Sequence, residues 1–201
     1  SLASGIAHFD GPGGTQTPRQ VGEAIAATLT GPLSNRGRNL VSDVNAEHAV
    51  ADFRSAYADL LAMPREGVVY GRSATQLTFD FSRALAKAWG PGDEVVVTRL
   101  DHDCNVRPWV LAAEGVGATV RWIDIDPATG EFDQASVEAA ITPRTRLVAV
   151  TGASNLLGTI PDVPTIASAA HDVGALVYVD GVHYAAHHLV DVPALGADFF
   201  V

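Results

Sequence analysis

Short apolar runs alternate with helical stretches along most of this chain, and that alternation narrows the possible folds more than any other feature. The apolar runs predict strands at residues 67–70, 94–98, 119–125, 146–151, 175–179 and 197–201. The stretches between them predict helices at residues 75–89, 105–114, 134–141 and 164–172, with Asp133 as the cap of the third and Gly174 at the end of the fourth. Runs such as 95–97 are apolar throughout, which is typical of strands covered on both faces. The sequence therefore predicts an α/β fold with a largely parallel sheet flanked by helices.

The N-terminal part of the chain does not follow this alternation. Residues 1–18 are rich in glycine, proline and threonine and predict a loop, which is followed by a helix at residues 19–29. Apolar residues at three- and four-residue spacing predict an amphipathic helix at about residues 44–61. We therefore expect an N-terminal arm and helix at residues 1–43 and a large α/β domain at residues 44–201.

Composition and charge argue against several classes of function. Hydrophobic residues make up 47% of the chain and charged residues 18%, which is typical of a globular domain. The formal net charge of -10 argues against binding to nucleic acid or to an anionic membrane surface. No apolar run approaches the roughly 18 residues of a membrane span. The single cysteine, Cys104, excludes an internal disulfide and favours a reducing compartment, so we expect a cytoplasmic protein.

Polar side chains follow four of the predicted strands at the point where each strand ends. In open α/β sheets, ligands bind beyond the carboxyl ends of the strands. The residues found there are Ser73 and Thr75 at a helix start, His102, Asn155 and Asp180. Because the carboxyl ends of parallel strands meet at one edge of a sheet, we expect these side chains to converge on one site.

Each of these residues also has a purely structural interpretation. Ser73 and Thr75 suit a phosphate at a helix N-terminus, but Ser and Thr are also ordinary N-cap residues. His102 could stack on an aromatic ligand or simply start the next helix. Asn155 could hydrogen-bond a ligand oxygen or adopt a turn conformation. Asp180 ends an apolar strand, so a buried carboxylate there needs a donor or a cation such as a pyridinium nitrogen, unless it caps a helix.

Other ligand motifs fit the sequence less well. His183, His187 and His188 have a spacing found in metal sites, but no carboxylate–histidine zinc motif accompanies them, and we expect no metal. Residues 115–117 follow a predicted helix rather than a strand, which is the wrong order for a dinucleotide-binding loop. Leu156 stands where the turn of a nucleophile elbow requires glycine.

Taken together, these motifs resemble those of the cysteine desulfurase and class V aminotransferase family of fold-type-I pyridoxal-phosphate enzymes. The segment Phe9–Thr15, Phe-Asp-Gly-Pro-Gly-Gly-Thr, is similar to the opening of a cysteine desulfurase-like branch of that family. The resemblance extends along nearly the whole chain. It implies a three-layer large domain, pyridoxal 5'-phosphate as the cofactor, an amino acid as the substrate, and a homodimer.

For the cofactor phosphate, the resemblance implies binding by the turn that follows the first strand of the large domain. That turn contains Ser73, Ala74 and Thr75, with Gln76 beside them. A helix N-terminus offers backbone N–H groups and a favourable dipole to an anion, which agrees with this role.

For the cofactor ring, the resemblance implies four further contacts. His102 would stack on the pyridine ring, and Asp180 would keep the ring nitrogen protonated. Asn155, within Ser154–Thr159, would lie near the phenolic oxygen. His183 stands three residues after the aspartate, where the family usually has glutamine, and is the last cofactor-binding candidate.

The family attaches its cofactor to a lysine, and the only lysine in this sequence is Lys87. It follows Thr75 by 12 residues, which is about 18 Å along a helix and away from the phosphate end. The resemblance implies that the Schiff-base lysine comes about five residues beyond Val201, followed by the nucleophilic cysteine and the carboxylate-binding arginine of a desulfurase. We therefore expect the N-terminal part of a longer enzyme, with an incomplete large domain and no catalytic residue in this chain.

Two classes of function stay open at this point. The first is a pyridoxal-phosphate enzyme acting on an amino acid, by cysteine desulfurase-like C–S cleavage or class V transamination, with the present chain inactive alone. The second is a non-catalytic binding or assembly module that kept the scaffold.

Overall fold

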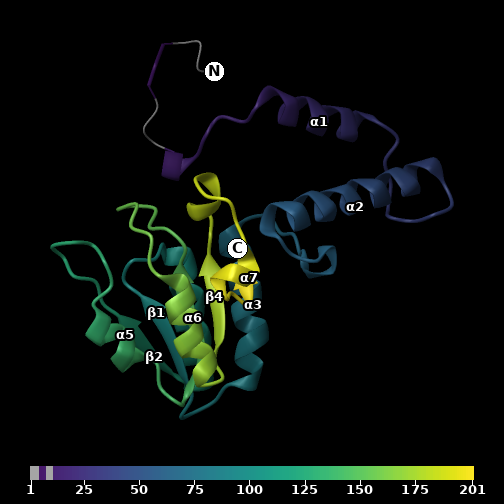
Figure 1. Cartoon of the computed structure of the whole chain (residues 1–201). Coiled ribbons are helices and arrows are strands. Elements are labelled where there is room, and N and C mark those ends of the chain that lie inside the picture. Colours follow the sequence, from purple (N-terminus) through teal and green to yellow (C-terminus); the bar gives the residue numbers. More distant parts are fainter. Residues whose placement is uncertain (1–4, 8–10) are drawn as a thin grey trace. The chain divides into compact units, whose positions relative to one another are not determined.

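A computed structural model of the chain describes residues 5–7 and 11–201 (Figure 1). The predicted opening segment Phe9–Thr15 therefore begins outside the described residues. The chain divides into two compact units, of which the first comprises residues 1–59 and 64–68 and the second residues 60–63 and 69–201.

The first unit contains two helices, α1 (Arg19–Thr30) and α2 (Val41–Leu61). Both helices are confirmed to within three residues at each end. In the basic loop at residues 35–38, Arg36 pairs with Glu47 of α2 at 2.8 Å. This loop is therefore tied to a helix of its own unit by a charge-assisted bond.

The second unit is built on a parallel sheet. Its described residues form five strands in the order β2-β1-β3-β4-β5, and every neighbouring pair is parallel. The strands are β1 (Glu94–Thr98), β2 (Thr119–Ile123), β3 (Thr145–Thr151), β4 (Leu176–Asp180) and β5 (Phe199–Phe200). The helices are α3 (Ala74–Leu85), α4 (Arg107–Val116), α5 (Gln134–Ala140), α6 (Val163–Asp172) and α7 (Val192–Leu195). This architecture confirms the predicted α/β class.

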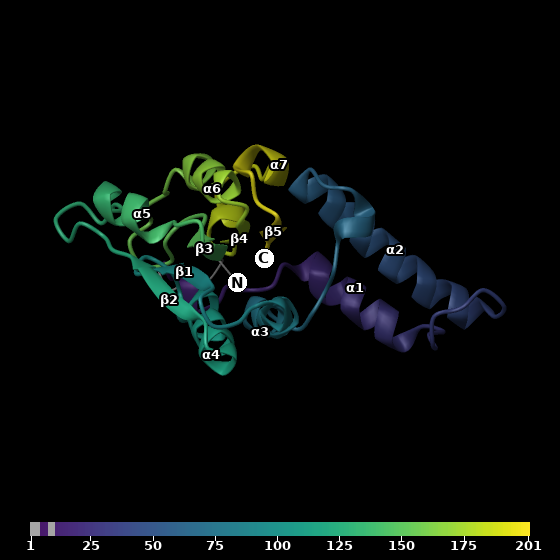
Figure 2. The ribbon, with the colours of Figure 1, turned by 90° about the horizontal axis from the view of Figure 1, so that it is seen from below.

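Helices cover both faces of this sheet, with α5, α6 and α7 on one face and α3 and α4 on the other (Figure 2). Successive residues of a strand point to opposite faces, so each strand contributes to two cores. Val96 packs in the core under α5 and α6, whereas Val95 and Val97 pack with Trp109 of α4. An unbroken apolar strand is therefore what this three-layer arrangement requires.

One predicted strand is wrong. In place of a strand at residues 67–70, Arg65–Gly67 form a short 3-10 turn, η3, and the chain then continues outside any strand to α3. Val69 and Tyr70 are 58% and 52% exposed, so the apolar run is not buried in a sheet. A strand needs apolar residues and also a neighbouring strand to pair with, and a short apolar run does not specify that neighbour.

Other boundaries differ by a few residues. The strand predicted at 119–125 ends at Ile123, and the strand predicted at 197–201 is reduced to Phe199–Phe200. The helix predicted to reach residue 89 ends at Leu85 and continues as a 3-10 turn, η4 (Ala86–Ala88). Asp133 is confirmed as the cap of α5, because its side chain accepts a hydrogen bond from the Ala135 amide.

Among the residues that the structure describes, no helix combines the length and apolar character needed to cross a bilayer.

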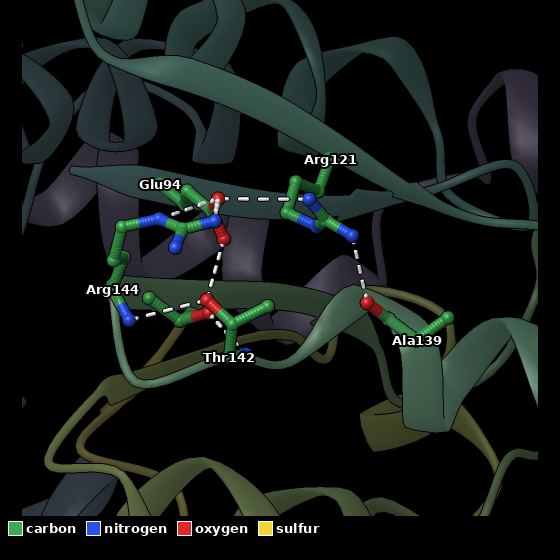
Figure 3. Close-up of polar contacts among 6 residues, drawn as sticks. Glu94, Arg121, Ala139, Thr142 and Arg144 are labelled. Atoms are coloured by element: carbon green, nitrogen blue, oxygen red, sulfur yellow. Dashed lines mark hydrogen bonds and ion pairs between the residues drawn. The ribbon is translucent and has the colours of Figure 1, made fainter. Parts of the chain in front are cut away.

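A charge cluster around one buried carboxylate joins β1 to its neighbours near the amino ends of the strands (Figure 3). Glu94, the first residue of β1, is 4% exposed and accepts hydrogen bonds from Arg144 (2.6 and 3.0 Å) and from Thr142 (2.6 Å). Arg121 of β2 lies 3.5 Å from the same carboxylate and also donates to the Ala139 carbonyl at 2.8 Å. A carboxylate buried at this level needs such partners, so the cluster fastens β1 to β2 and to the turn before β3.

Candidate functional site

The strand order places a switch point at the carboxyl ends of β1 and β3. The chain passes from β1 to β2 on one side and then returns to form β3 on the other side of β1. The connections that leave β1 and β3 therefore diverge and open a crevice, where α/β proteins bind their ligands. Thr151 at the end of β3 is in register with Asp180 at the end of β4, so the loops after all three strands lie at this edge.

The start of α3 is formed by a reciprocal cap. The Ser73 hydroxyl accepts a hydrogen bond from the Gln76 amide at 3.2 Å, and the Gln76 side chain accepts one from the Arg72 amide at 3.4 Å. Ser73 thus has the structural role that its residue type allows. Thr75 follows it on the exposed first turn, and Ala74 is half-buried. The helix end still offers the dipole and amide groups that suit a phosphate.

The turn after β1 is held by a chain of side-chain hydrogen bonds. Asp101 accepts bonds from the Thr98 hydroxyl and from the Asn105 amide (2.7 Å). The Asn105 oxygen in turn accepts from the Trp109 indole at 3.0 Å, inside the core beneath α4. His102 is exposed, and its Nδ1 accepts from the Cys104 amide at 3.1 Å. The network therefore fixes the backbone that presents the His102 ring at the sheet edge.

Asp180 is the buried acid of this edge. The residue is 5% exposed, and its two carboxylate oxygens accept from the Val182 amide (3.0 Å) and from the Cys104 thiol (3.3 Å). The short turn that carries Cys104 also packs against α3. The structure therefore brings one predicted ligand, Asp180, into direct contact with Cys104.

Burial shifts the proton affinities of two groups beside Asp180. The pKa of Asp101 is raised to about 7, chiefly by desolvation, with the charge of Asp180 adding to the rise and hydrogen bonds from Thr98 and Asn105 opposing it. The pKa of Cys104 is raised to about 12, first by desolvation and then by the charge of Asp180. Cys104 is therefore a neutral thiol at physiological pH and not a nucleophile.

The residue after Asp180 has to be glycine. A side chain at Gly181 would overlap the ring of Phe200 in β5. The Gly181 amide also donates to the Val201 carbonyl at 2.7 Å. This close approach lets the backbone turn directly behind the Asp180 carboxylate.

Asn155 and His183 lie in the loops after β3 and β4. Among the residues that the structure describes, neither side chain hydrogen-bonds to another of the predicted ligands. Asn155 is half-buried in a turn held by Ser154, whose hydroxyl accepts from the Leu156 and Leu157 amides at 3.4 and 3.3 Å. The His183 ring contacts that of His187, with their centres 4.9 Å apart.

Two members of the site were not singled out as ligands from the sequence. Asp101 and Cys104 both belong to the segment around His102, but nothing in the residue pattern indicates that their side chains are buried against Asp180. An aspartate and a cysteine beside a histidine are equally compatible with an exposed loop. Only the packing of that segment against β4, 76 residues further along, distinguishes the two cases.

The geometry of Asp180 fits a cationic ligand. A buried carboxylate ordinarily has a positively charged partner. In the part of the chain that the structure describes, no ion pair includes Asp180, and its two donors are neutral. A protonated pyridine nitrogen would supply the missing charge, so these residues fit pyridoxal phosphate.

Comparison with known proteins agrees with this geometry. Residues 7–201 match the family model for aminotransferase class-V. The chain is 37% identical over 202 residues to an uncharacterized protein of Mycobacterium tuberculosis (strain CDC 1551 / Oshkosh), covering 98% of this chain and 50% of that protein. It is 33% identical over 204 residues to a cysteine desulfurase of Enterobacter sp. (strain 638), covering 98% and 49%.

A solved structure is similar along the same length. The apo structure of a cysteine desulfurase from Thermococcus onnurineus NA1 superposes with a TM-score of 0.90 at 29% identity, over 99% of this chain and 50% of that one. The chain thus spans about half the length of the curated relatives it matches. Because the family model covers nearly all of its residues, this chain belongs to the class-V aminotransferase family, which includes the cysteine desulfurases.

Proposed function

We propose that this chain is the N-terminal part of a pyridoxal-phosphate-dependent enzyme that acts on an amino acid in the manner of a cysteine desulfurase. The observation that carries the proposal is Asp180, a buried carboxylate at the carboxyl edge of a parallel sheet with only neutral donors around it. The similarity to cysteine desulfurases supports cysteine as the substrate. A homodimer and a cytoplasmic location are parts of the same proposal.

When bound, pyridoxal phosphate supplies an electron sink that stabilises negative charge at the α-carbon of an amino acid. Asp180 would hold the proton on the ring nitrogen, which keeps that sink effective. His102 would cover one face of the ring and exclude water from it. Asn155 and His183 would hydrogen-bond the phenolic oxygen.

The phosphate would bind at the first turn of α3. Ser73, Ala74 and Thr75, with Gln76 beside them, present a helix N-terminus whose dipole favours an anion. The turn at residues 103–105 packs against α3, and its Cys104 donates to Asp180, so the phosphate end and the nitrogen end of the ligand would be held by elements that contact the same turn.

Replacement of Asp180 in the protein that contains this chain and its downstream half tests the proposal. We expect Asp180→Asn to lower the affinity for pyridoxal phosphate by about ten- to a hundredfold, because a charged hydrogen bond to the ring nitrogen is lost. The matched control is Asp191→Asn, an exposed cap of α7. Unchanged cofactor affinity in Asp180→Asn would sink the assignment.

The second candidate, a non-catalytic module, predicts that no lysine of the full-length protein holds the cofactor. Lys87 is exposed in η4, at the end of α3 opposite to Ser73. Borohydride fixes the cofactor to any lysine that holds it, and peptide mapping then locates that lysine. A modified lysine in the downstream half supports the enzyme, whereas bound cofactor without any modified lysine supports the module.

A further inference from the structure

Cys104 lies beside Asp180, the residue on which the proposed function rests. Its thiol donates to Oδ2 of Asp180 at 3.3 Å, and the short turn that carries Cys104 packs against α3. Cys104 itself is 9% exposed and belongs to the short 3-10 turn η5 (Asp103–Asn105). The thiol is therefore a polar group held against the buried acid.

The chemical state of this thiol limits what it can do. Desolvation and the neighbouring carboxylates Asp180 and Asp101 keep the pKa of Cys104 far above neutral. The sulfur therefore carries its proton and acts as a weak hydrogen-bond donor. Sulfur transfer by Cys104 would require the thiolate, so the nucleophile of a desulfurase has to be another residue.

Among the described residues, each oxygen of Asp180 accepts one hydrogen bond from a protein donor. The Val182 amide holds Oδ1 through the backbone turn, and the Cys104 thiol holds Oδ2. A carboxylate oxygen accepts more than one hydrogen bond, so both retain capacity for a ligand. With both oxygens held, the carboxylate loses rotational freedom before a ligand arrives, and less entropy is lost on binding.

We propose that Cys104 is a positioning residue, whose thiol orients the Asp180 carboxylate for a protonated ring nitrogen. The proposal rests on the proposed function, because the ligand of Asp180 is the pyridine nitrogen of the cofactor. Cys104 does not touch the reacting atoms. It affects cofactor binding only by orienting Asp180.

The contact with Asp180 is tested without any cofactor. The S–H stretching band lies in a spectral window free of other protein bands, and the difference spectrum against Cys104→Ser isolates this thiol. We expect a band shifted to low wavenumber by its carboxylate acceptor, and a move to higher wavenumber in Asp180→Asn, whose amide oxygen is a weaker acceptor. Asp180→Ala serves if the Asn variant does not fold. A band that neither variant moves overturns the proposal.

The functional role is tested with two ligands in the full-length protein. We expect Cys104→Ala to lower the affinity for pyridoxal phosphate by about three- to tenfold. The same variant should bind a deaza analogue, with carbon in place of the ring nitrogen, as well as the unmodified protein does. Cys104→Ser, which keeps a donor, should restore the affinity for pyridoxal phosphate.

The outcomes separate this proposal from the proposed function. Equal losses for both ligands, or failure of Cys104→Ser to restore binding, would mean that Cys104 only fills space, and the positioning role falls while the enzyme stands. If no variant and no unmodified protein binds pyridoxal phosphate, the proposed function itself is overturned. If Cys104→Ala loses affinity for pyridoxal phosphate but not for the deaza analogue, and Cys104→Ser restores it, both the positioning role and the proposed function are supported.

Discussion

Thr78 and Tyr178 share a buried hydrogen bond of 3.1 Å between their hydroxyl groups. The Thr78 hydroxyl donates to the Ala74 carbonyl at 2.9 Å, so the proton between the two hydroxyls comes from Tyr178. Tyr178 lies in β4, two residues before Asp180, and Ala74 begins α3. The bond therefore links the helix that would bind the phosphate to the strand that carries the buried acid.

Removing this link should destabilise the second unit by a measurable amount. We expect Tyr178→Phe to lower the free energy of unfolding by about 0.5–1.5 kcal/mol, because one buried hydrogen bond is lost while the ring stays packed. Thr78→Val and the double variant complete a double-mutant cycle, measured by urea denaturation. A coupling energy indistinguishable from zero would contradict a direct bond between the two hydroxyls.

Asp101 should make stability depend on pH between 3.8 and about 7. Its pKa is raised from 3.8 to about 7, so the folded protein binds a proton that the unfolded chain releases. The stabilising contribution is therefore complete below pH 3.8 and is lost as pH rises through about 7. We expect Asp101→Asn to remove this fall from the curve of unfolding free energy against pH.

Replacing Asp180 provides a control for the pH dependence attributed to Asp101. The charge of Asp180 raises the pKa of Asp101, so Asp180→Asn should move the upper end of that pH window downward. An identical curve in the Asp180→Asn protein would show that the two carboxyl groups do not interact.

Local patterns predicted most of the fold, because burial on both faces favours apolar residues at the middle positions of the central strands. Val95–Val97 in β1 are an example, and α5 begins at its predicted cap, Asp133. Residues 67–70 show the limit, since apolar character does not specify a partner strand. α7 has four residues, too few for a helical period to be recognised.

The candidate site likewise has features that local sequence predicts and contacts that it does not. The residue types after each strand predict a ligand site at this edge, since strand ends are local features, and that site stays a prediction. The contact between Cys104 and Asp180 joins residues 76 positions apart, and it depends on how β1 and β4 are arranged around β3. No local pattern contains that information.

Glu94 should contribute stability that disappears in acid. Desolvation opposes its ionisation, but hydrogen bonds from Thr142 and Arg144 outweigh that effect and hold the pKa of Glu94 below its usual 4.5. The contribution is therefore present above pH 4.5 and lost as pH falls through the lower, folded value. We expect Glu94→Gln to cost about 1–3 kcal/mol at neutral pH, and the difference from the unmodified protein to shrink in acid. A difference that is constant with pH would mean that the charge of Glu94 is not what the cluster in Figure 3 requires.

Gly181 should tolerate no side chain, because the ring of Phe200 occupies the space that a Cβ needs. We expect Gly181→Ala to lower the free energy of unfolding by about 1–3 kcal/mol through overpacking. Gly115→Ala is the matched control: it lies within α4 with open space around the new Cβ, and there the same change should stabilise by about 0.5–1 kcal/mol. Phe200→Leu removes the overlapping ring atoms, so the cost of Gly181→Ala should fall in that background. If the cost is the same in the Phe200→Leu background as in the unmodified protein, the requirement for glycine comes from the backbone turn behind Asp180 and not from the ring.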